Sequence, residues 1–478
     1  MTKIIKPFLL LCIALLQPPV LAEVELPKMG DTSGSIISPE EERKLGEAFM
    51  RELRRAVDIN EDPESVEYIQ SLGYRVAAQA QSPINFNFFI VDSPVINAFA
   101  APGGYIGIHS GLILETKTES ELASVLAHET AHVTQRHLPR AFEQASKLSL
   151  PTAAALIAAI ILAQNNPDIA HAALATTIAG SQQSMINFTR ANEKEADNMG
   201  MQYLAAAHFD PMGMPAFFSR LHKAHRYYDN KLPEYLSTHP ITLSRIAESK
   251  SRAAQFPKKQ TISDESFYPL LKAKLRVQTD NTGFKSLNYY KKALDVSNNH
   301  INHYGYALAL LKANRAIKAE KHASLLLKQQ PENAAFIHLS SRIKLKLGHN
   351  QETIDLITKA LKIYPRHYPL TMLLAEALLD DDQAYEAQRL LLDQIYYRKP
   401  TPSLYQLFAK ATAKVGLHAE SHEALAEYHY QQGAIAMAIN QLVSALKIAD
   451  KKNFHLISRL EARKAELTYE LKLRTDKH

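Results

Sequence analysis

The second half of this 478-residue chain repeats with a constant period of 34 residues. The turn-forming residues Asn314, Gly348, Asp382 and Gly416 follow one another at that spacing, and a proline recurs at the same interval in LLKQQP and ALKIYP. A 34-residue period of paired helices is typical of tetratricopeptide repeats, because a single helical hairpin cannot bury its apolar face without stacking on neighbours. The sequence therefore predicts an α-solenoid of about four repeats, closed by a capping helix from about residue 454.

The first 22 residues have the pattern of an export signal. Lys3 and Lys6 precede the apolar run FLLLCIALL, and the small residues Val20 and Ala22 suit cleavage after Ala22. That run is too short to span a bilayer. The chain's single cysteine, Cys12, lies in this segment, so a metal site in the mature chain would consist of histidines and carboxylates.

The sequence between the signal and the repeats combines helical spacing with β-rich segments. Because INFNFFIVDSP and VINAFAAPGGYIGIHSGLI are bounded by proline and glycine, they predict a small sheet, with Gly103–Gly104 as a turn between two strands. We therefore expect a mainly α protein in which an α+β domain over residues 23–260 is followed by a linker over 261–284 and a repeat domain over 285–478.

Two apolar stretches interrupt the predicted α+β domain at residues 152–163 and 169–180. Each is too short for a transmembrane helix. They fit a buried helical hairpin, or else a surface that dips into a membrane or holds unfolded chain.

The string HETAH at residues 128–132 lies in a predicted helix that begins with a capping box of Thr118 and Glu121 and ends near Pro139. Helical spacing of four puts His128 and His132 on one face, where both imidazoles can bind one ion. The intervening Glu129 could then act as a base. Polar groups in an otherwise small and apolar helix need partners, so a metal site is the simplest explanation.

A zinc protease needs a third protein ligand. The metzincin pattern is absent, because Gln135 and Leu138 occupy the positions that it requires. His137 is five residues beyond the second histidine of the motif, and helix geometry predicts a surface position that points away from the site.

The segment NEKEAD offers a better third ligand. Glu193 and Asp197 are four residues apart and share a helix face. Glu193 could complete the metal site, and Asp197 could accept the free ring N–H of a ligand histidine. Glu195 competes for the ligand role but faces elsewhere if Asp197 faces the site.

The order of these motifs resembles the M48 family of zinc metallopeptidases. The resemblance covers about residues 97–245, from the strand APGGYIGIHSGLI through HETAH and NEKEAD to STHP and the arginine after it. It implies a zincin-like metalloendopeptidase domain with one Zn²⁺ per chain. By this resemblance His128, His132 and Glu193 would be the zinc ligands and Glu129 the general base.

Three further roles are left open by the resemblance. His239, in the His-Pro motif, could stabilise the oxyanion of the reaction, occupy a fourth zinc position and keep the enzyme latent, or be an ordinary loop histidine. Arg245 could orient the substrate or serve the structure. The strand around Gly104–Ser110 could bind an extended substrate by pairing along its edge.

The combination of signal, peptidase domain and repeats resembles periplasmic members of that family that act on outer-membrane β-barrel proteins. This resemblance implies misfolded or misassembled β-barrels as substrates, a chaperone-like role, and the barrel-assembly machinery as partner of the repeats. The implied location is the periplasm, either soluble or at the periphery of the outer membrane. The alternative is a non-proteolytic chaperone or scaffold with a latent or structural zinc site.

Charge is distributed unevenly between the two halves. Residues 23–270 contain 22 basic and 29 acidic residues, whereas residues 271–478 contain 31 and 20. The basic repeats favour an acidic partner or contact with a membrane surface, although a solvated basic solenoid would look the same. No interleaved basic and aromatic stretch indicates nucleic acid.

Overall fold

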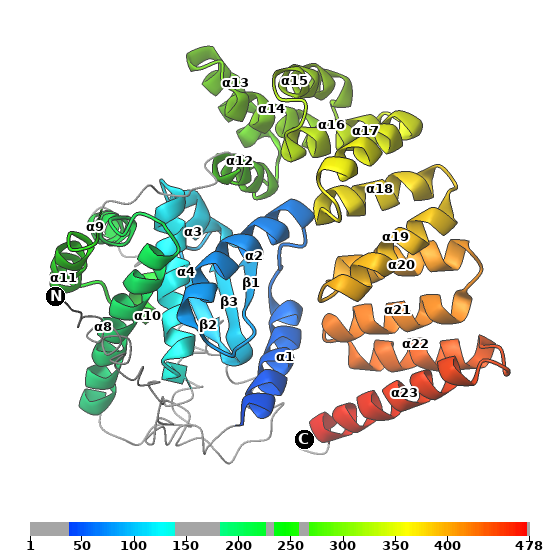
Figure 1. Ribbon diagram of the computed structural model, residues 1–478, viewed down its shortest axis with the longest axis horizontal. Helices are drawn as coiled ribbons and strands as arrows, with labels where there is room; N and C mark the ends of the chain where they lie inside the picture. The colour runs from blue at the N-terminus through cyan, green and yellow to red at the C-terminus, as the bar shows by residue number, and fades with distance from the viewer. Residues whose placement is uncertain (1–37, 139–181, 226–233, 258–266, 476–478) are drawn as a thin grey trace, which may run out of the picture.

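The computed structural model describes residues 38–138, 182–225, 234–257 and 267–475. The predicted signal peptide and the apolar stretches at 152–163 and 169–180 lie outside these residues. Figure 1 shows an N-terminal domain with a small sheet and, beside it, an array of paired helices that runs from α12 to α23. None of the described helices is both long and apolar enough to cross a lipid bilayer.

The sheet of the N-terminal domain has three strands, β1 (Asn87–Val91), β2 (Ala98–Ala101) and β3 (Tyr105–His109). Their order is β1-β3-β2, with β3 parallel to β1 and antiparallel to β2. The predicted turn at Gly103–Gly104 is confirmed, since it joins β2 to β3 with φ angles of 72° and 77° that favour glycine.

The position of β3 contradicts one expectation. We expect from the sequence that the strand around Gly104–Ser110 binds substrate along its edge, but this strand is the centre of the sheet. Both of its sides are already paired, to β1 and to β2. The substrate-binding edge therefore cannot be β3, and within the described residues β2 has the unpaired edge on that side of the sheet.

Helices pack around this sheet: α1 packs on the strands in a small apolar cluster, and the other helices share a larger apolar core. Leu72 and Val76 of α2, Ile106 and Ile108 of β3, and Leu126 of α4 are all almost fully buried in it. The helices of this domain are α1 (Pro39–Ala56), α2 (Pro63–Ala77), α3 (Ser110–Glu115), α4 (Glu119–Thr134), α8 (Gln182–Ala206), α9 (Gly213–His225), α10 (Glu234–Thr238) and α11 (Leu243–Ala253).

Helix α4 carries the HETAH string, and its two ends differ in part from the prediction. The side chain of Thr118 caps the start by accepting from the N–H of Glu121. The Glu121 carboxylate does not complete a capping box, because it binds the Lys117 N–H and Arg220. The helix ends at Thr134, before Pro139, since Arg136 takes a left-handed backbone conformation with φ of 54°.

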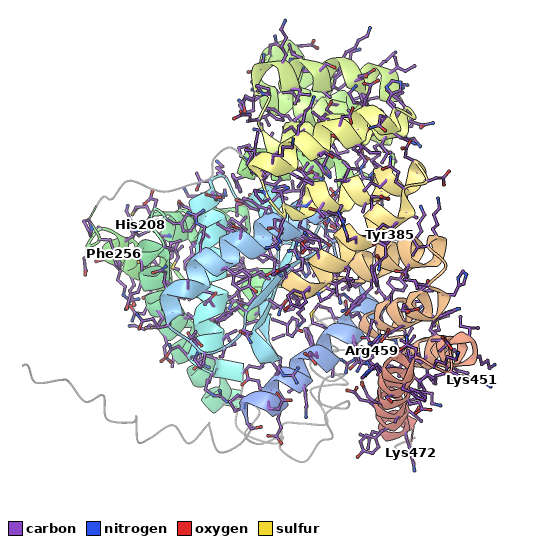
Figure 2. All side chains as sticks on the ribbon, turned by 45° about the vertical axis from the view of Figure 1, so that its right-hand side comes forward. His208, Phe256, Tyr385, Lys451, Arg459 and Lys472 are labelled. Atoms are coloured by element: carbon purple, nitrogen blue, oxygen red, sulfur yellow. The ribbon has the colours of Figure 1, made fainter. Side chains whose placement is uncertain are left out.

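The array of paired helices follows the predicted 34-residue period. Asn314, Gly348, Asp382 and Gly416 each adopt a left-handed conformation at the turn within a helical pair, with φ between 57° and 83°. In Figure 2 the labelled Tyr385, Arg459 and Lys472 lie on this array, on the opposite side of the molecule from His208 and Phe256. The helices of the array are α12 (Tyr268–Gln278), α13 (Phe284–Val296), α14 (His300–Lys312), α15 (Ala316–Gln329), α16 (Ala334–Lys346), α17 (Asn350–Ile363), α18 (Tyr368–Asp380), α19 (Ala384–Tyr397), α20 (Pro402–Lys414), α21 (His418–Gln431), α22 (Ile435–Ile448) and α23 (Phe454–Thr475).

Helix α12 lies inside the segment 261–284 that the sequence assigns to a linker. Leu271 and Leu275 are buried in the core of the N-terminal domain, whereas Leu270 and Val277 are buried in the first core of the repeats. The segment begins with polar residues but contains an 11-residue helix that both cores share, so this part of the expected linker is a packed element.

A buried cluster of charged side chains also joins the two parts. Glu64, at the start of α2, is 4% exposed and forms ion pairs with Lys274 of α12 and His338 of α16, whose Nδ1 is 3.0 Å from the Glu64 Oε2. Lys274 also lies 2.8 Å from Asp62. Polar groups buried in this way hold only when they are paired, so the cluster fixes α2 against α12 and α16.

Candidate metal centre

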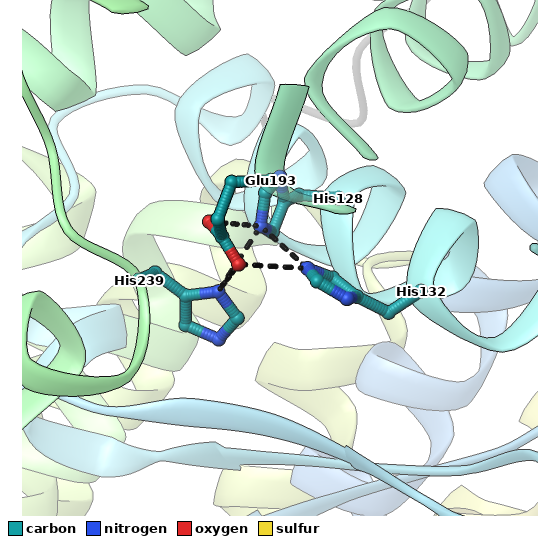
Figure 3. Close-up of side chains that lie close together, drawn as sticks. All are labelled: His128, His132, Glu193 and His239. Atoms are coloured by element: carbon teal, nitrogen blue, oxygen red, sulfur yellow. Dashed lines mark hydrogen bonds and ion pairs between the residues drawn. The ribbon is translucent and has the colours of Figure 1, made fainter. Parts of the chain in front are cut away.

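Three segments that are far apart in the sequence bring four donor side chains together. Helix α4 contributes His128 and His132, α8 contributes Glu193, and the residue after α10 is His239. One donor atom from each of these side chains lies within 4.8 Å of all the others. Figure 3 shows the four side chains converging on a common point.

The distances within this group are short. The two Nε2 atoms of His128 and His132 are 3.0 Å apart, and the Nε2 of His132 is 3.3 Å from Glu193 Oε1. The Nδ1 of His239 lies 2.9 Å from the same carboxylate oxygen and 3.3 Å from the Nε2 of His128. All four side chains are buried or nearly so, which means that their donor atoms face one another rather than solvent.

The close packing of α8 against α4 sets these distances. Gly200 of α8 lies against the backbone of Ala127 and His128, and a Cβ at this position would be only 3.0 Å from their backbone atoms. Glu193 and Asp197 are on the same face of α8, seven and three residues before this contact. The small residue therefore brings the acidic face of α8 within reach of His128.

Asp197 faces the ring nitrogen of His128 that points away from the donor group. Its Oδ1 is 3.1 Å from the Nδ1 of His128. This is the position that the predicted role of Asp197 requires, namely orienting the imidazole and fixing its tautomer.

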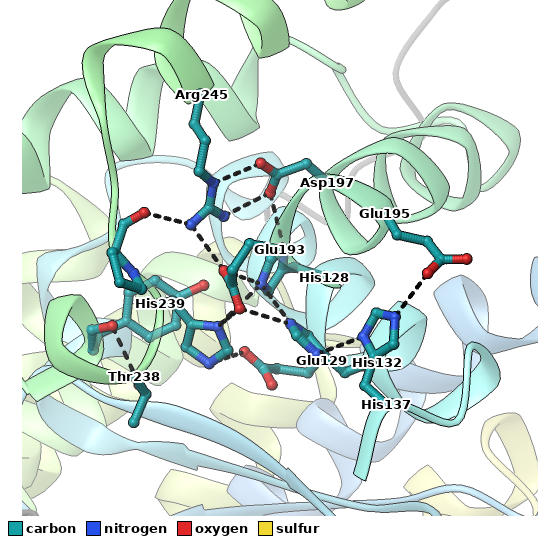
Figure 4. A network of polar contacts seen from close by, with 12 residues as sticks. His128, Glu129, His132, His137, Glu193, Glu195, Asp197, Thr238, His239 and Arg245 are labelled. Atoms are coloured by element: carbon teal, nitrogen blue, oxygen red, sulfur yellow. Dashed lines mark hydrogen bonds and ion pairs between the residues drawn. The ribbon is translucent and has the colours of Figure 1, made fainter. Parts of the chain in front are cut away.

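The guanidinium of Arg245 contacts other groups of the protein. Its Nε and Nη2 each donate to a different carboxylate oxygen of Asp197 at 2.8 Å, and its Nη1 lies 2.8 Å from Glu193 Oε2 (Figure 4). The same Nη1 also donates to the carbonyl of Pro240 at 2.8 Å. These contacts support the structural alternative for Arg245, because they hold both carboxylates in place.

Glu129 and His239 face each other across the site. The Nε2 of His239 is 3.5 Å from Glu129 Oε1, and the ring of His239 is stacked at a tilt against that of Tyr235, with centroids 4.8 Å apart. Tyr235 was not singled out by the sequence. Its hydroxyl is buried and has no hydrogen-bond partner among the described residues.

His137 contradicts the surface position expected from helix geometry. It is 4% exposed, its Nδ1 is 2.9 Å from the Nδ1 of His132, and its Nε2 is 3.1 Å from Glu195 Oε2. The expectation assumed that the helix continues, whereas the left-handed conformation of Arg136 turns the chain back toward His132. A left-handed arginine has no sequence signature, so this contact could not be read from spacing.

Burial and neighbouring charged groups shift the pKa values of the site residues in both directions. Burial opposes a charge on His128, but the nearby carboxylates of Asp197 and Glu193 outweigh it and raise the pKa of His128 to about 10. Burial lowers the pKa of His132 to about 3 and raises the pKa of Glu129. Although burial also opposes the ionisation of Glu193, the facing histidines hold its pKa well below the ordinary value.

The composition of the site fits a bound cation. Among the described residues, three buried carboxylates, those of Glu129, Glu193 and Asp197, surround the site, and Arg245 is the guanidinium that pairs with two of them. Glu129 Oε1 has no hydrogen-bond partner among these residues. Two imidazoles and a carboxylate are one of the ligand sets of catalytic zinc sites.

A helix with two histidines, a facing acidic helix and a small sheet define the class of zincin-like metallopeptidases, and in this chain the domain is followed by tetratricopeptide-like repeats. The model of peptidase family M48 matches residues 63–253. The chain is 36% identical over 428 residues to the beta-barrel assembly-enhancing protease of Escherichia coli (strain K12), covering 88% of this chain and 86% of that protein. This chain therefore belongs to peptidase family M48.

Two further relatives agree with this assignment. The beta-barrel assembly-enhancing protease of Yersinia pestis is 35% identical over 427 residues, which cover 88% of this chain and 87% of that protein. The mitochondrial metalloendopeptidase OMA1 of Arabidopsis thaliana is 30% identical over 157 residues, which cover 33% of this chain and 29% of that protein. The chain is accordingly a metalloendopeptidase.

Proposed function

We propose that the protein binds one Zn²⁺ through His128, His132 and Glu193 and uses it to hydrolyse peptide bonds. The observation that carries the proposal is the convergence of these donors in a buried group whose ligand atoms lie within 4.8 Å of one another. When bound, zinc would polarise the scissile carbonyl and make a water molecule easier to deprotonate.

Glu129 is the proposed general base. It is 1% exposed, and its Oε1 faces the donor group without a hydrogen bond to another described residue. It would take a proton from the attacking water and pass it to the leaving amine. Asp197 would hold the Nδ1 proton of His128, so that the other ring nitrogen remains available as a ligand.

His239 has two proposed roles, as a fourth zinc ligand or as the group that stabilises the oxyanion, and the distances support the first more directly. Its Nδ1 lies within the donor group, 2.9 Å from Glu193, which supports a fourth ligand that keeps the enzyme latent. The oxyanion role would require the imidazole to move out of this group while substrate is bound. In both cases His239 gates the site, and His239→Ala should change both metal coordination and the rate of peptide cleavage.

Extended substrate would bind along β2 rather than β3. The chain two residues before β2 supports this placement, since the Ile96 carbonyl accepts from the N–H of Tyr235, one turn before His239. Pairing with an edge strand recognises backbone more than side chains. Such a mode suits a protease that acts on unfolded chains of varied sequence.

The names of the Escherichia coli and Yersinia pestis relatives support a narrower substrate class. We propose that this protein degrades, or helps to assemble, misfolded outer-membrane β-barrel proteins in the periplasm, in solution or at the periphery of the outer membrane. The barrel-assembly machinery would be the partner of the repeats.

The first repeats offer a surface for an acidic partner or a membrane. On α13 and α15, six exposed lysines accompany only two acidic residues, Asp295 and Glu320, and the apolar side chains of Phe284, Val296 and Ile317 are also exposed. Basic and apolar side chains exposed on these helices favour anionic partners.

The central test is Glu129→Gln, which keeps the size of the side chain and removes the base. The purified variant should retain zinc in metal analysis and lose cleavage of an unfolded β-barrel protein, by roughly the 10²–10⁴-fold typical of a lost general base. The unaltered protein is the positive control for both measurements. Zinc-dependent cleavage at an unchanged rate in the variant would contradict the proposed mechanism.

A further inference from the structure

A second line of polar contacts lies behind His132, on the side away from the donor group. The Nε2 of His132 faces His128 and Glu193, whereas its Nδ1 is 2.9 Å from the Nδ1 of His137. The Nε2 of His137 is in turn 3.1 Å from Glu195 Oε2 (Figure 4). His132, His137 and Glu195 thus form a continuous series from the donor group to the partly exposed side of α8.

The backbone holds His137 in this position. The left-handed conformation of Arg136 directs the chain back over the end of α4, and the side chain of Arg136 lies 3.4 Å from Glu42 of α1. His137 is 4% exposed, and its two ring nitrogens contact residues from two different helices, α4 and α8. The imidazole is therefore fixed at both ends.

With a metal bound at the Nε2 of His132, these contacts are satisfied by one arrangement of protons. Two ring nitrogens at 2.9 Å need one donor and one acceptor. If the Nε2 of His132 offers its lone pair to a metal, its proton is on Nδ1 and is donated to the Nδ1 of His137. The proton of His137 is then on Nε2, where it is donated to the carboxylate of Glu195.

We propose that His137 is a positioning residue that holds His132 in its metal-binding tautomer and orientation, with Glu195 as its anchor. This inference rests on the proposed zinc site. The two ligand histidines would be oriented differently, because His128 faces the carboxylate of Asp197 directly. The Nδ1 of His132 reaches a carboxylate through a neutral imidazole, which keeps the charge of Glu195 farther from the ion.

The test compares two variants of nearly equal size, His137→Asn and His137→Leu. The amide oxygen of asparagine can stand near the position of Nδ1 and accept from His132, whereas leucine cannot. Zinc affinity, measured by competition with a chelator, should fall about 10–100-fold in His137→Leu, the range for lost partners of ligand histidines. Most of this loss should be recovered in His137→Asn.

Cobalt provides a second readout that does not depend on activity. The visible absorption of the Co²⁺-loaded protein reports ligand geometry, and we expect it to change in His137→Leu and to remain close to the unaltered spectrum in His137→Asn. Glu195→Leu removes the anchor at a partly exposed position and should weaken zinc binding in the same direction. This variant keeps the proposal testable if His137→Leu does not fold.

The controls separate this inference from the proposed function. His455→Leu, at an exposed position of α23, should leave zinc affinity unchanged. Absence of zinc binding by the unaltered protein would overturn the proposed zinc site itself. Normal zinc binding by both the unaltered protein and His137→Leu, or equal losses in the leucine and asparagine variants, would overturn the role of His137 alone.

Discussion

Arg245 shows how much of the site depends on one side chain. Its guanidinium is 11% exposed and contacts both Asp197 and Glu193. These two carboxylates are buried, so without a cation nearby they would repel each other at a point that water cannot reach. Arg245 therefore makes it possible for α8 to present two acidic side chains to the same helix.

We predict that Arg245→Met destabilises the metal-free protein by about 3–5 kcal/mol, the range for removing one member of a buried ion pair. Zinc should restore more stability to the variant than it adds to the unaltered protein, since a divalent cation compensates the same carboxylates. Urea unfolding with and without zinc measures both effects. Arg252→Met, at a more exposed ion pair of the same helix, should change stability by less than about 1 kcal/mol.

For individual residues, helical periodicity is what allows the site to be predicted from the sequence. Spacings of four place His128 with His132 and Glu193 with Asp197, and the structure brings these four residues together. Their roles as ligands and orienting group stay predictions. His137 could not be predicted, because its position depends on a left-handed residue that breaks the periodicity on which the inference relies.

The contact between α4 and α8 sets the position of Glu193 and Asp197 relative to the histidines of α4. The two helices approach closely at Gly200, and its missing side chain leaves room for the backbone of Ala127 and His128. The neighbours are backbone atoms in the middle of a helix, which cannot move aside as a flexible side chain would.

We predict that Gly200→Ala pushes α8 away from α4 and weakens zinc binding. Overpacking should cost about 1–3 kcal/mol, against which the higher helix propensity of alanine returns only about 1 kcal/mol. Thermal unfolding and chelator competition report the two effects. Lys194→Ala, at an exposed position of the same helix, is the control, and an unaltered zinc affinity in Gly200→Ala would contradict the prediction.

Turns and helices could be predicted from the sequence wherever a repeat period or a turn-forming residue marks them. The turns at Asn314 and Gly348 follow from the repeat period, and the glycine pair between β2 and β3 follows from turn chemistry. The order of the strands did not follow, because no local pattern states that β3 pairs with both neighbours. For this reason the sequence suggested the wrong strand for substrate.

In the whole molecule, the charged cluster around Glu64 joins the peptidase domain to the repeats. Lys274 is buried and has two acidic partners, Asp62 and Glu64. Burial opposes ionisation of Glu64, but His338 and Lys274 outweigh it and hold the pKa of this carboxyl below its ordinary value of 4.5.

This shift predicts how stability depends on pH. A carboxyl whose pKa is lower in the folded than in the unfolded state stabilises the fold above the unfolded pKa, and this contribution is lost as the pH falls below it. Glu64→Gln should therefore lower the free energy of unfolding by about 3 kcal/mol near pH 7, since it breaks a buried pair that Asp62 only partly replaces.

The difference between Glu64→Gln and the unaltered protein should shrink as the pH is lowered below 4.5, which denaturant unfolding at several pH values would measure. The matched control is Glu67→Gln on the same helix, whose carboxylate is 42% exposed and pairs with Arg398 of the repeats. That variant should lose less than about 1 kcal/mol. A constant difference across this pH range would contradict the assignment.

The relation between the two halves was the least predictable part of the fold. Composition changes sharply near residue 260, and a polar start there suggests a flexible connection. The apolar residues of α12 are divided between the core of the N-terminal domain and the first core of the repeats. Such a pattern can be interpreted only when the positions of both domains are known.

The shared helix has a consequence for how a bound partner would be presented to the active centre. A flexible tether would allow the repeats to search a wide volume. Within the described residues α12 provides no hinge, because it is buried in both cores and its Tyr268 hydroxyl bonds to Thr116, close to the start of α4. A protein held by the repeats would therefore meet α4 at a fixed distance and angle. The protein would then select substrates by the distance between the part bound to the repeats and an unfolded segment.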